Sequence, residues 1–201
     1  VGFQGLIERN LGSMVWSPLS NLLLYGDTAR VDAAKRAGVR IGLGSDWSPS
    51  GSKNLLGELK VAWLYSQHVL GGLFSAREVM AMATREPARI LKWHDALGTL
   101  EAGKRADVVV MTGRDGDPYE AFIRAKETAI SLVMINGVAR YGTSELMKRL
   151  APRGETVRVG GKARRCYLQQ ETADPDVAQV SLRTARSALQ KAFRNLPRLA
   201  R

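Results

Sequence analysis

The sequence is poor in cysteine, histidine and long apolar runs. Its single cysteine, Cys166, excludes a disulfide within the chain and a cluster of several thiolates, and a lone thiol favours a packing role over catalysis. No stretch approaches about eighteen consecutive apolar residues, which excludes a helical membrane span, and the first residues lack the charged-then-apolar order of a secretory signal. We therefore expect a soluble, cytoplasmic protein with no membrane partner.

Acidic residues are scarce as well, and their shortage is uneven. The net charge is +11, and residues 152–201 contribute +7 of it, with eleven Lys or Arg against four Asp or Glu. A basic tail can attract nucleic acid or an acidic membrane surface. No nucleic-acid-binding motif and no interleaved aromatic residues accompany the charge, so we interpret the tail as a solvated helix face with a loose end and do not expect nucleic acid as a partner.

Enough apolar residues remain for a folded core, because 45% of the 201 residues are hydrophobic. Two short apolar segments, residues 12–17 and 39–44, predict strands. Helices are predicted at residues 29–37, 54–69, 75–83 and 84–93. Short apolar strands that alternate with helices indicate parallel βα units, and hence an α/β fold.

After Gly98 the pattern changes from helices to strands. Asn136-Gly137 predicts a tight hairpin because both residues tolerate positive φ, and Gly160-Gly161 indicates a second one. Strands are predicted at residues 106–111, 130–135 and 138–141, and a last amphipathic helix at residues 175–195. The chain thus divides into an α/β segment at residues 1–97, a small β-domain at 98–170, and a basic helix and tail at 171–201.

Asp46 is the most informative single residue. The strand at residues 39–44 delivers it to the carboxyl end, where parallel α/β enzymes place their catalytic groups, and the small residues Gly44 and Ser45 let a ligand approach the backbone. A carboxylate in that position can bind a divalent cation or accept a proton. The alternative is an aspartate that only caps the following turn, and local pattern leaves both interpretations open.

Four segments, taken in order, resemble one known family. Residues 15–22 (VWSPLSNL) and 37–46 (AGVRIGLGSD) are similar to the seventh- and eighth-strand segments of amidohydrolases related to cytosine deaminase and the chlorohydrolases. Residues 83–91 and 97–110 resemble the family's last barrel helix and its return to a small β-domain. The resemblance implies the C-terminal portion of a (β/α)8 TIM-type barrel, followed by strands of a small β-sandwich domain and a C-terminal helix.

The resemblance also implies a metal site and a reaction. Asp46 would be a metal ligand that accepts a proton and passes it to the leaving nitrogen, and Ser20, Asn21 and Trp47 would border a small-molecule substrate. The metal would be a divalent ion, zinc in the first place and iron as the alternative. We expect hydrolysis of C–N bonds, in a cyclic amide or an amidine, or by deamination.

The other metal ligands that the resemblance implies are missing from this sequence. Amidohydrolases of this type bind metal through a His-x-His pair from the first strand and histidines from the fifth and sixth strands. This sequence has no His-x-His, and His68 and His94 stand where the resemblance places no ligand. We therefore expect an incomplete chain, which begins with Val1 and lacks the N-terminal barrel strands.

A second class of function stays open. The chain is alternatively a non-catalytic binding or assembly module that keeps the amidohydrolase scaffold and has a basic partner-binding tail. Self-association into a homo-oligomer is compatible with either class, because a pair of barrel strands that is not closed into a cylinder exposes strand edges.

We predict that the 201-residue chain alone neither retains zinc nor hydrolyses a substrate. One carboxylate, that of Asp46, cannot replace the roughly three protein ligands of a hydrolytic zinc site. Dialysis against metal-free buffer and elemental analysis should leave far less than one zinc ion per chain. Stoichiometric zinc that an Asp46→Ala variant loses would contradict this expectation.

Overall fold

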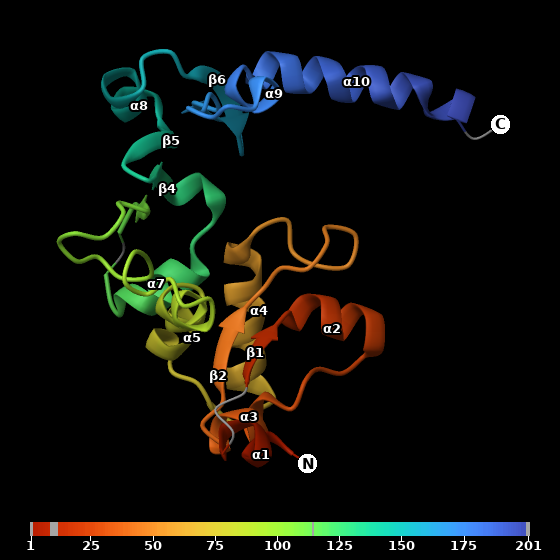
Figure 1. Ribbon diagram of the computed structural model, residues 1–201, viewed down its shortest axis with the longest axis vertical. Coiled ribbons are helices and arrows are strands. Elements are labelled where there is room, and N and C mark those ends of the chain that lie inside the picture. The colour runs from red at the N-terminus through yellow and green to blue at the C-terminus, as the bar shows by residue number, and fades with distance from the viewer. Residues whose placement is uncertain (1, 9–11, 114, 200–201) are drawn as a thin grey trace. The chain divides into compact units, whose positions relative to one another are not determined.

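The computed structural model describes residues 2–8, 12–113 and 115–199 and has an α/β fold (Figure 1). The chain forms two compact units. The first unit comprises residues 1–105 and 113–125, and the second comprises residues 106–112 and 126–201. None of the described helices is long and apolar enough to cross a membrane.

The first unit is mostly helical around one pair of strands. Its elements are α1 (Phe3–Glu8), β1 (Ser13–Trp16), α2 (Pro18–Tyr25), α3 (Val31–Arg36), β2 (Arg40–Leu43), α4 (Leu55–His68), α5 (Ala76–Met82), α6 (Arg85–Ile90) and α7 (Pro118–Arg124). β1 and β2 pair in parallel, from Ser13 opposite Arg40 to Trp16 opposite Leu43. The parallel βα arrangement predicted from the sequence is therefore confirmed.

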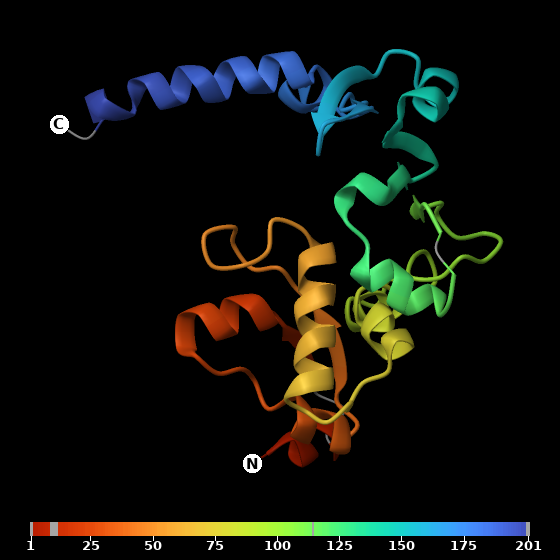
Figure 2. The same cartoon turned by 180° about the vertical axis from the view of Figure 1, so that it is seen from behind.

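The core of this unit is built on the strand pair and on α4, which lies along it in both views (Figure 1, Figure 2). Trp16 is completely buried, and its ring meets that of Tyr65 edge to face with the centroids 6.2 Å apart. The other large buried side chains of the unit include Val31, Ile41, Leu43, Leu59, Phe74 and Val79. Burying an aromatic and several branched aliphatic side chains is the main stabilising contribution to this unit.

The start of α5 carries the capping box that its sequence predicts. The Ser75 hydroxyl accepts from the Glu78 amide, and the Glu78 carboxylate accepts from the Ser75 amide at 2.8 Å. The same carboxylate receives the Lys35 ammonium of α3 at 2.8 Å, and Lys35 also donates to the Leu73 carbonyl. α3 and α5 are thus tied together through one carboxylate.

The second unit is an antiparallel sheet with strand order β3-β4-β5-β7-β6. Its elements are β3 (Val108–Met111), a 3-10 turn at Glu127–Ala129, β4 (Ile130–Ile135), β5 (Val138–Thr143), α8 (Ser144–Leu150), β6 (Glu155–Val159), β7 (Lys162–Cys166), α9 (Pro175–Ala178) and α10 (Leu182–Leu199). Both predicted hairpins are confirmed. Asn136 and Gly137 have φ of 51° and 77°, and Gly160 and Gly161 have φ of 54° and 77°.

The predicted last helix is wrong in one respect, because the chain forms α9 and α10 with a break between them. At the break the Ser181 hydroxyl accepts from the Thr184 amide at 3.0 Å, and the Thr184 hydroxyl accepts from the Ser181 amide at 2.9 Å. This reciprocal cap starts a new helix. The sequence analysis also missed α1, α2, α7 and α8. Pro18 directly follows the strand predicted at residues 12–17, and a proline also suits the first position of a helix.

Glu78 should make the stability of the first unit depend on pH. Partial burial alone would raise the pKa of Glu78, but the hydrogen bonds from Lys35 and Ser75 outweigh it and lower the pKa below its ordinary value. A carboxyl with a lowered pKa stabilises the fold above its ordinary pKa, and this contribution is lost as pH falls through the lowered value. Glu78→Gln should therefore cost about 0.5–1 kcal/mol at pH 7.

The pH dependence of that difference is the decisive readout. The gap between wild type and Glu78→Gln should shrink as pH falls below the ordinary pKa of a glutamate and through the lowered pKa of Glu78, because the wild-type carboxyl then becomes protonated. Urea unfolding followed by tryptophan fluorescence measures it, because Trp16, Trp47, Trp63 and Trp93 all belong to the first unit. A gap that stays constant from pH 7 to pH 3 would contradict the ion-pair account.

Candidate active site at the ends of the parallel strands

The candidate site lies where β1 and β2 end side by side. Their parallel pairing continues one step further, since the Gly44 amide donates to the Trp16 carbonyl at 2.9 Å. A Cβ on Gly44 would lie 2.9 Å from a methyl group of Val15, so a larger residue there would have to displace that side chain. The segments that follow both strands therefore start from the same edge of the sheet.

Asp46 and Ser20 are brought together at this edge. The Ser20 hydroxyl, in the first turn of α2, donates to the Asp46 carboxylate at 2.6 Å and lies 3.1 Å from the Ser50 hydroxyl. Ser20 and Ser50 are buried, whereas Asp46 is exposed and has a positive φ of 51°. A buried hydroxyl thus fixes an accessible carboxylate in a backbone conformation that is uncommon for residues other than glycine.

The loop after Asp46 is closed by backbone contacts. The Gly51 amide donates to the Trp47 carbonyl at 2.8 Å, and a Cβ on Gly51 would lie only 1.9 Å from the Ser45 carbonyl oxygen. Only glycine fits there without a backbone shift. Trp47 itself is 64% exposed beside Asp46. The sequence-based prediction that Trp47 borders a substrate stays a prediction.

Asn21 has a different environment from Ser20. Its side-chain oxygen accepts from the Thr28 hydroxyl at 3.1 Å, and that hydroxyl accepts from the indole nitrogen of Trp16 at 2.7 Å. Asn21 also lines an open hollow of about 220 Å³ with Tyr25, Asp27, Thr28 and Ala29. These bonds fix the chain between α2 and α3, and a substrate contact by Asn21 stays a prediction.

Glu58, on α4, is the important residue that the sequence analysis missed. It is completely buried, and its two carboxylate oxygens accept from backbone amides: Oε2 from Leu19 at 3.1 Å and Oε1 from Ser52 at 2.9 Å. Leu19 lies in the first turn of α2 and Ser52 in the loop after β2. One buried carboxylate therefore connects the two segments that carry Ser20 and Asp46. A pattern clue existed, since Glu58 shares a helix face with Leu55 and Ala62.

Three other candidate donors, His68, His94 and Cys166, belong to other parts of the chain. His68 is exposed at the end of α4, and the imidazole of His94, also exposed, lies 3.8 Å from the Asp95 carboxylate. Cys166 is partly buried on β7, and burial, reinforced by the Glu155 carboxylate, raises the pKa of its thiol. Residues 2–8, 12–113 and 115–199 contain no group of three His, Cys, Asp or Glu that could hold a metal ion. The described residues alone do not fit a hydrolytic metal centre.

Comparison with known proteins establishes the family. The family model described as the amidohydrolase family matches residues 5–140, which is more than half of the chain. The chain belongs to the amidohydrolase family. The resemblance found in the four sequence segments is therefore confirmed, and the family match includes Ser20, Asp46 and Glu58.

Relatives of this amidohydrolase include deaminases and a chlorohydrolase. It is 39% identical over 108 residues to a 5-methylthioadenosine/S-adenosylhomocysteine deaminase of Desulforudis audaxviator, an alignment that covers 52% of this chain and 25% of the relative. The structure is similar to an adenosine deaminase from Xanthomonas campestris with bound zinc, with a TM-score of 0.63, 26% identity, and coverage of 69% of this chain and 34% of the other.

A zinc complex of the atrazine chlorohydrolase from Arthrobacter aurescens TC1 is also similar, with a TM-score of 0.58, 29% identity, and coverage of 68% of this chain and 32% of that one. The amidohydrolase chain therefore spans about a quarter to a third of the length of these relatives.

Glu58→Gln should destabilise the first unit by about 1–3 kcal/mol, because one accepting carboxylate oxygen is replaced by an amide NH2 group, which cannot accept from the backbone N–H that it faces. Urea unfolding followed by tryptophan fluorescence measures the loss. Glu171→Gln, at an exposed position, is the matched control and should stay within about 0.5 kcal/mol of wild type. An unchanged midpoint in Glu58→Gln would show that this carboxylate is dispensable.

Proposed function

We propose that these residues serve a metal-dependent hydrolase that acts on C–N bonds, by deaminating an aminated heterocycle or by opening a cyclic amide or amidine. The observation that carries the proposal is the pair Ser20–Asp46, a buried hydroxyl that holds an exposed carboxylate at the carboxyl ends of two parallel strands. Relatives named as deaminases support the cleavage of a C–N bond, and the similar chlorohydrolase supports hydrolysis in general.

Asp46 is the proposed acid–base residue. An exposed carboxylate with a fixed orientation can accept a proton from attacking water and return it to the leaving nitrogen. The 2.6 Å hydrogen bond from Ser20 restricts its rotation, which is the contribution we assign to that hydroxyl. We propose that Trp47, Asn21 and Ser20 border the substrate, as the sequence predicts.

The proposal requires metal ligands other than those in the described residues. Asp46 offers a single oxygen ligand, whereas a hydrolytic zinc site takes about three protein ligands and an open position. We propose that Asp46 completes such a site together with histidine imidazoles that lie outside the described residues. Zinc is the favoured ion because it is bound in two similar structures, and iron is the alternative.

The same comparison supports a finer description of the fold. We propose that the first unit is the end of a (β/α)8 barrel and that the five-stranded sheet belongs to a small β-sandwich, with domains at residues 1–97, 98–170 and 171–201. The competing function is a non-catalytic binding or assembly module on this scaffold. It is favoured by the lack of a group of three metal-binding side chains among the described residues.

Asp46→Asn should abolish most activity in the natural polypeptide that contains these residues. After zinc loading, we expect release of ammonia from at least one member of a panel of aminated purines, pyrimidines and triazines, or opening of a cyclic amide. The variant should lose about a thousandfold in kcat with little change in KM, because an amide cannot accept the proton.

The control for this experiment is Asp95→Asn. The Asp95 side chain is 95% exposed and has no proposed part in the reaction, so this variant should keep full activity. Full activity of Asp46→Asn would overturn the assignment of Asp46. A zinc-loaded wild-type protein that is inactive on the whole panel would instead favour the binding or assembly module.

A further inference from the structure

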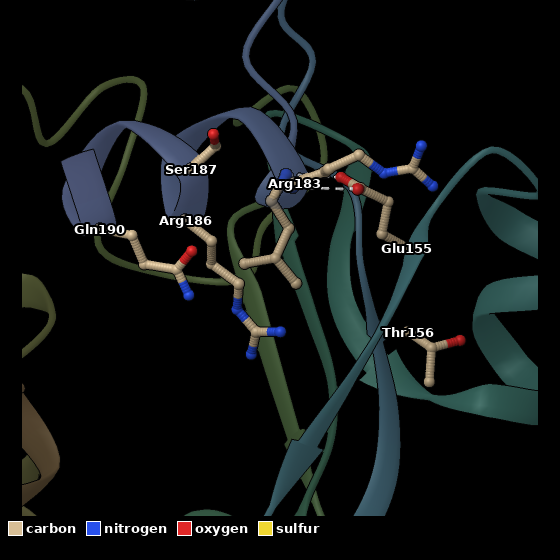
Figure 3. Close-up of a pocket in the computed structure, with 7 residues that line it drawn as sticks. Glu155, Thr156, Arg183, Arg186, Ser187 and Gln190 are labelled. Carbon is tan, nitrogen blue, oxygen red and sulfur yellow. Dashed lines mark hydrogen bonds between the residues drawn. The ribbon is translucent and has the colours of Figure 1, made fainter.

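α10 is an amphipathic helix whose first residues are hydrogen-bonded to the neighbouring strand β6. The Glu155 carboxylate, from β6, accepts from the Leu182 amide at 2.5 Å and the Arg183 amide at 3.2 Å (Figure 3). A carboxylate at a helix N-terminus also interacts favourably with the helix dipole. An open hollow of about 540 Å³ lies beside this anchor and is lined by Glu155, Thr156, Leu182, Arg183, Arg186, Ser187 and Gln190. Beyond its first turns α10 extends away from the sheet of its own unit (Figure 1, Figure 2).

The apolar face of α10 is uncovered beyond that anchor. Leu189, Phe193 and Leu196 are 60%, 68% and 52% exposed. Together with Leu182, Ala185 and Ala192 they recur at three- and four-residue steps, so they form one stripe along the helix. Large apolar side chains gathered on one exposed face are typical of a surface that binds something.

The charge of the helix is of one sign. The described side chains include Arg183, Arg186, Lys191 and Arg194, and residues 177–201 contain no Asp or Glu. At about 100° per residue, Arg186 lies beside the apolar stripe and the other three lie on the opposite side. The partner of this helix must therefore accept an apolar face and favour positive charge next to it.

A second copy of the helix fits this pattern poorly. Small residues, Ala185 and Ala192, occupy every other position of the stripe, and the stripe covers only about two heptads where a coiled coil needs about three or four. Flanking positions lack the opposite charges that pair helices in a coiled coil. Nucleic acid would engage the cations and leave Leu189 and Phe193 in water.

We propose that α10 binds to an anionic lipid surface, lying in the plane of the interface. Leucine and phenylalanine would enter the boundary between headgroups and acyl chains, which needs no preformed pocket, and the cations would attract acidic headgroups. Arg186, at the edge of the stripe, is long enough to reach from an inserted face back to the headgroups. This inference does not depend on the hydrolase function, and it differs from the sequence-based expectation of a chain without a membrane partner.

The test is sedimentation of the full 201-residue chain with lipid vesicles. We expect binding to phosphatidylcholine vesicles that contain about one third phosphatidylserine, at least tenfold weaker binding to pure phosphatidylcholine, and a decline of binding with added salt. Phe193→Ser and Leu189→Ser should each lose most of the binding. Arg194→Gln should weaken it roughly fivefold.

Leu100→Ser is the matched control, because Leu100 is 76% exposed in the first unit, and it should bind like wild type. Circular dichroism should show that the Phe193→Ser chain keeps its helix content, since the position is exposed. Equal binding to both vesicle types, or unchanged binding of the Phe193→Ser and Leu189→Ser chains, would overturn the proposal.

Three other occupants would also be recognised. A dimer in light scattering that Phe193→Ser abolishes, without vesicle binding, would assign the stripe to a second copy. Binding of duplex DNA without vesicle binding would assign the cations to nucleic acid. The third result is that, in the absence of lipid, α10 of the monomeric chain is protected from hydrogen exchange in wild type and unprotected in Phe193→Ser. That result would show that the stripe packs against another part of the same chain. Each result would overturn the lipid proposal.

Discussion

One buried carboxylate connects the parts of the chain on which the candidate site depends. Glu58 accepts the amide of Leu19 at the start of α2 and the amide of Ser52 in the loop after β2, so it holds together segments that the chain separates by more than thirty residues. A fully buried ionised group is costly unless its oxygens are hydrogen-bonded, and two amides satisfy that requirement here. Together with the pairing of β1 and β2, this connection holds the segments that carry Ser20 and Asp46.

The amidohydrolase assignment gives that arrangement a chemical meaning. Parallel strands bring their carboxyl ends to one edge, and chemistry on such scaffolds is placed by the loops that leave that edge. In this chain the loops present an exposed carboxylate, fixed by a buried hydroxyl, and a tightly closed turn that only Gly51 permits. The site is therefore built by packing and backbone contacts, and the proposed chemistry needs ligands that the described residues do not supply.

Much of this could be predicted from the sequence, and the failures have physical causes. Short apolar segments indicate both parallel strands, periodic apolar residues indicate α4, and positive-φ dipeptides indicate both hairpins. The spacing of Ser75 and Glu78 indicates the capping box of α5. Asp46 was recognisable because it follows a strand. The missed helix α2 starts at a proline, which is compatible with either a strand end or a helix start. The role of Glu58 depends on contacts with residues 39 and 6 positions away, which no local pattern contains.

The central claim is that Asp46 is the carboxylate of a metal centre, and anomalous diffraction at the zinc edge tests it most directly. Crystals of the natural polypeptide that contains these residues, loaded with zinc, should show an ion within about 2.0–2.2 Å of an Asp46 carboxylate oxygen, with imidazoles completing its coordination. Zinc bound elsewhere, with the Asp46 carboxylate facing only Ser20, would contradict the claim.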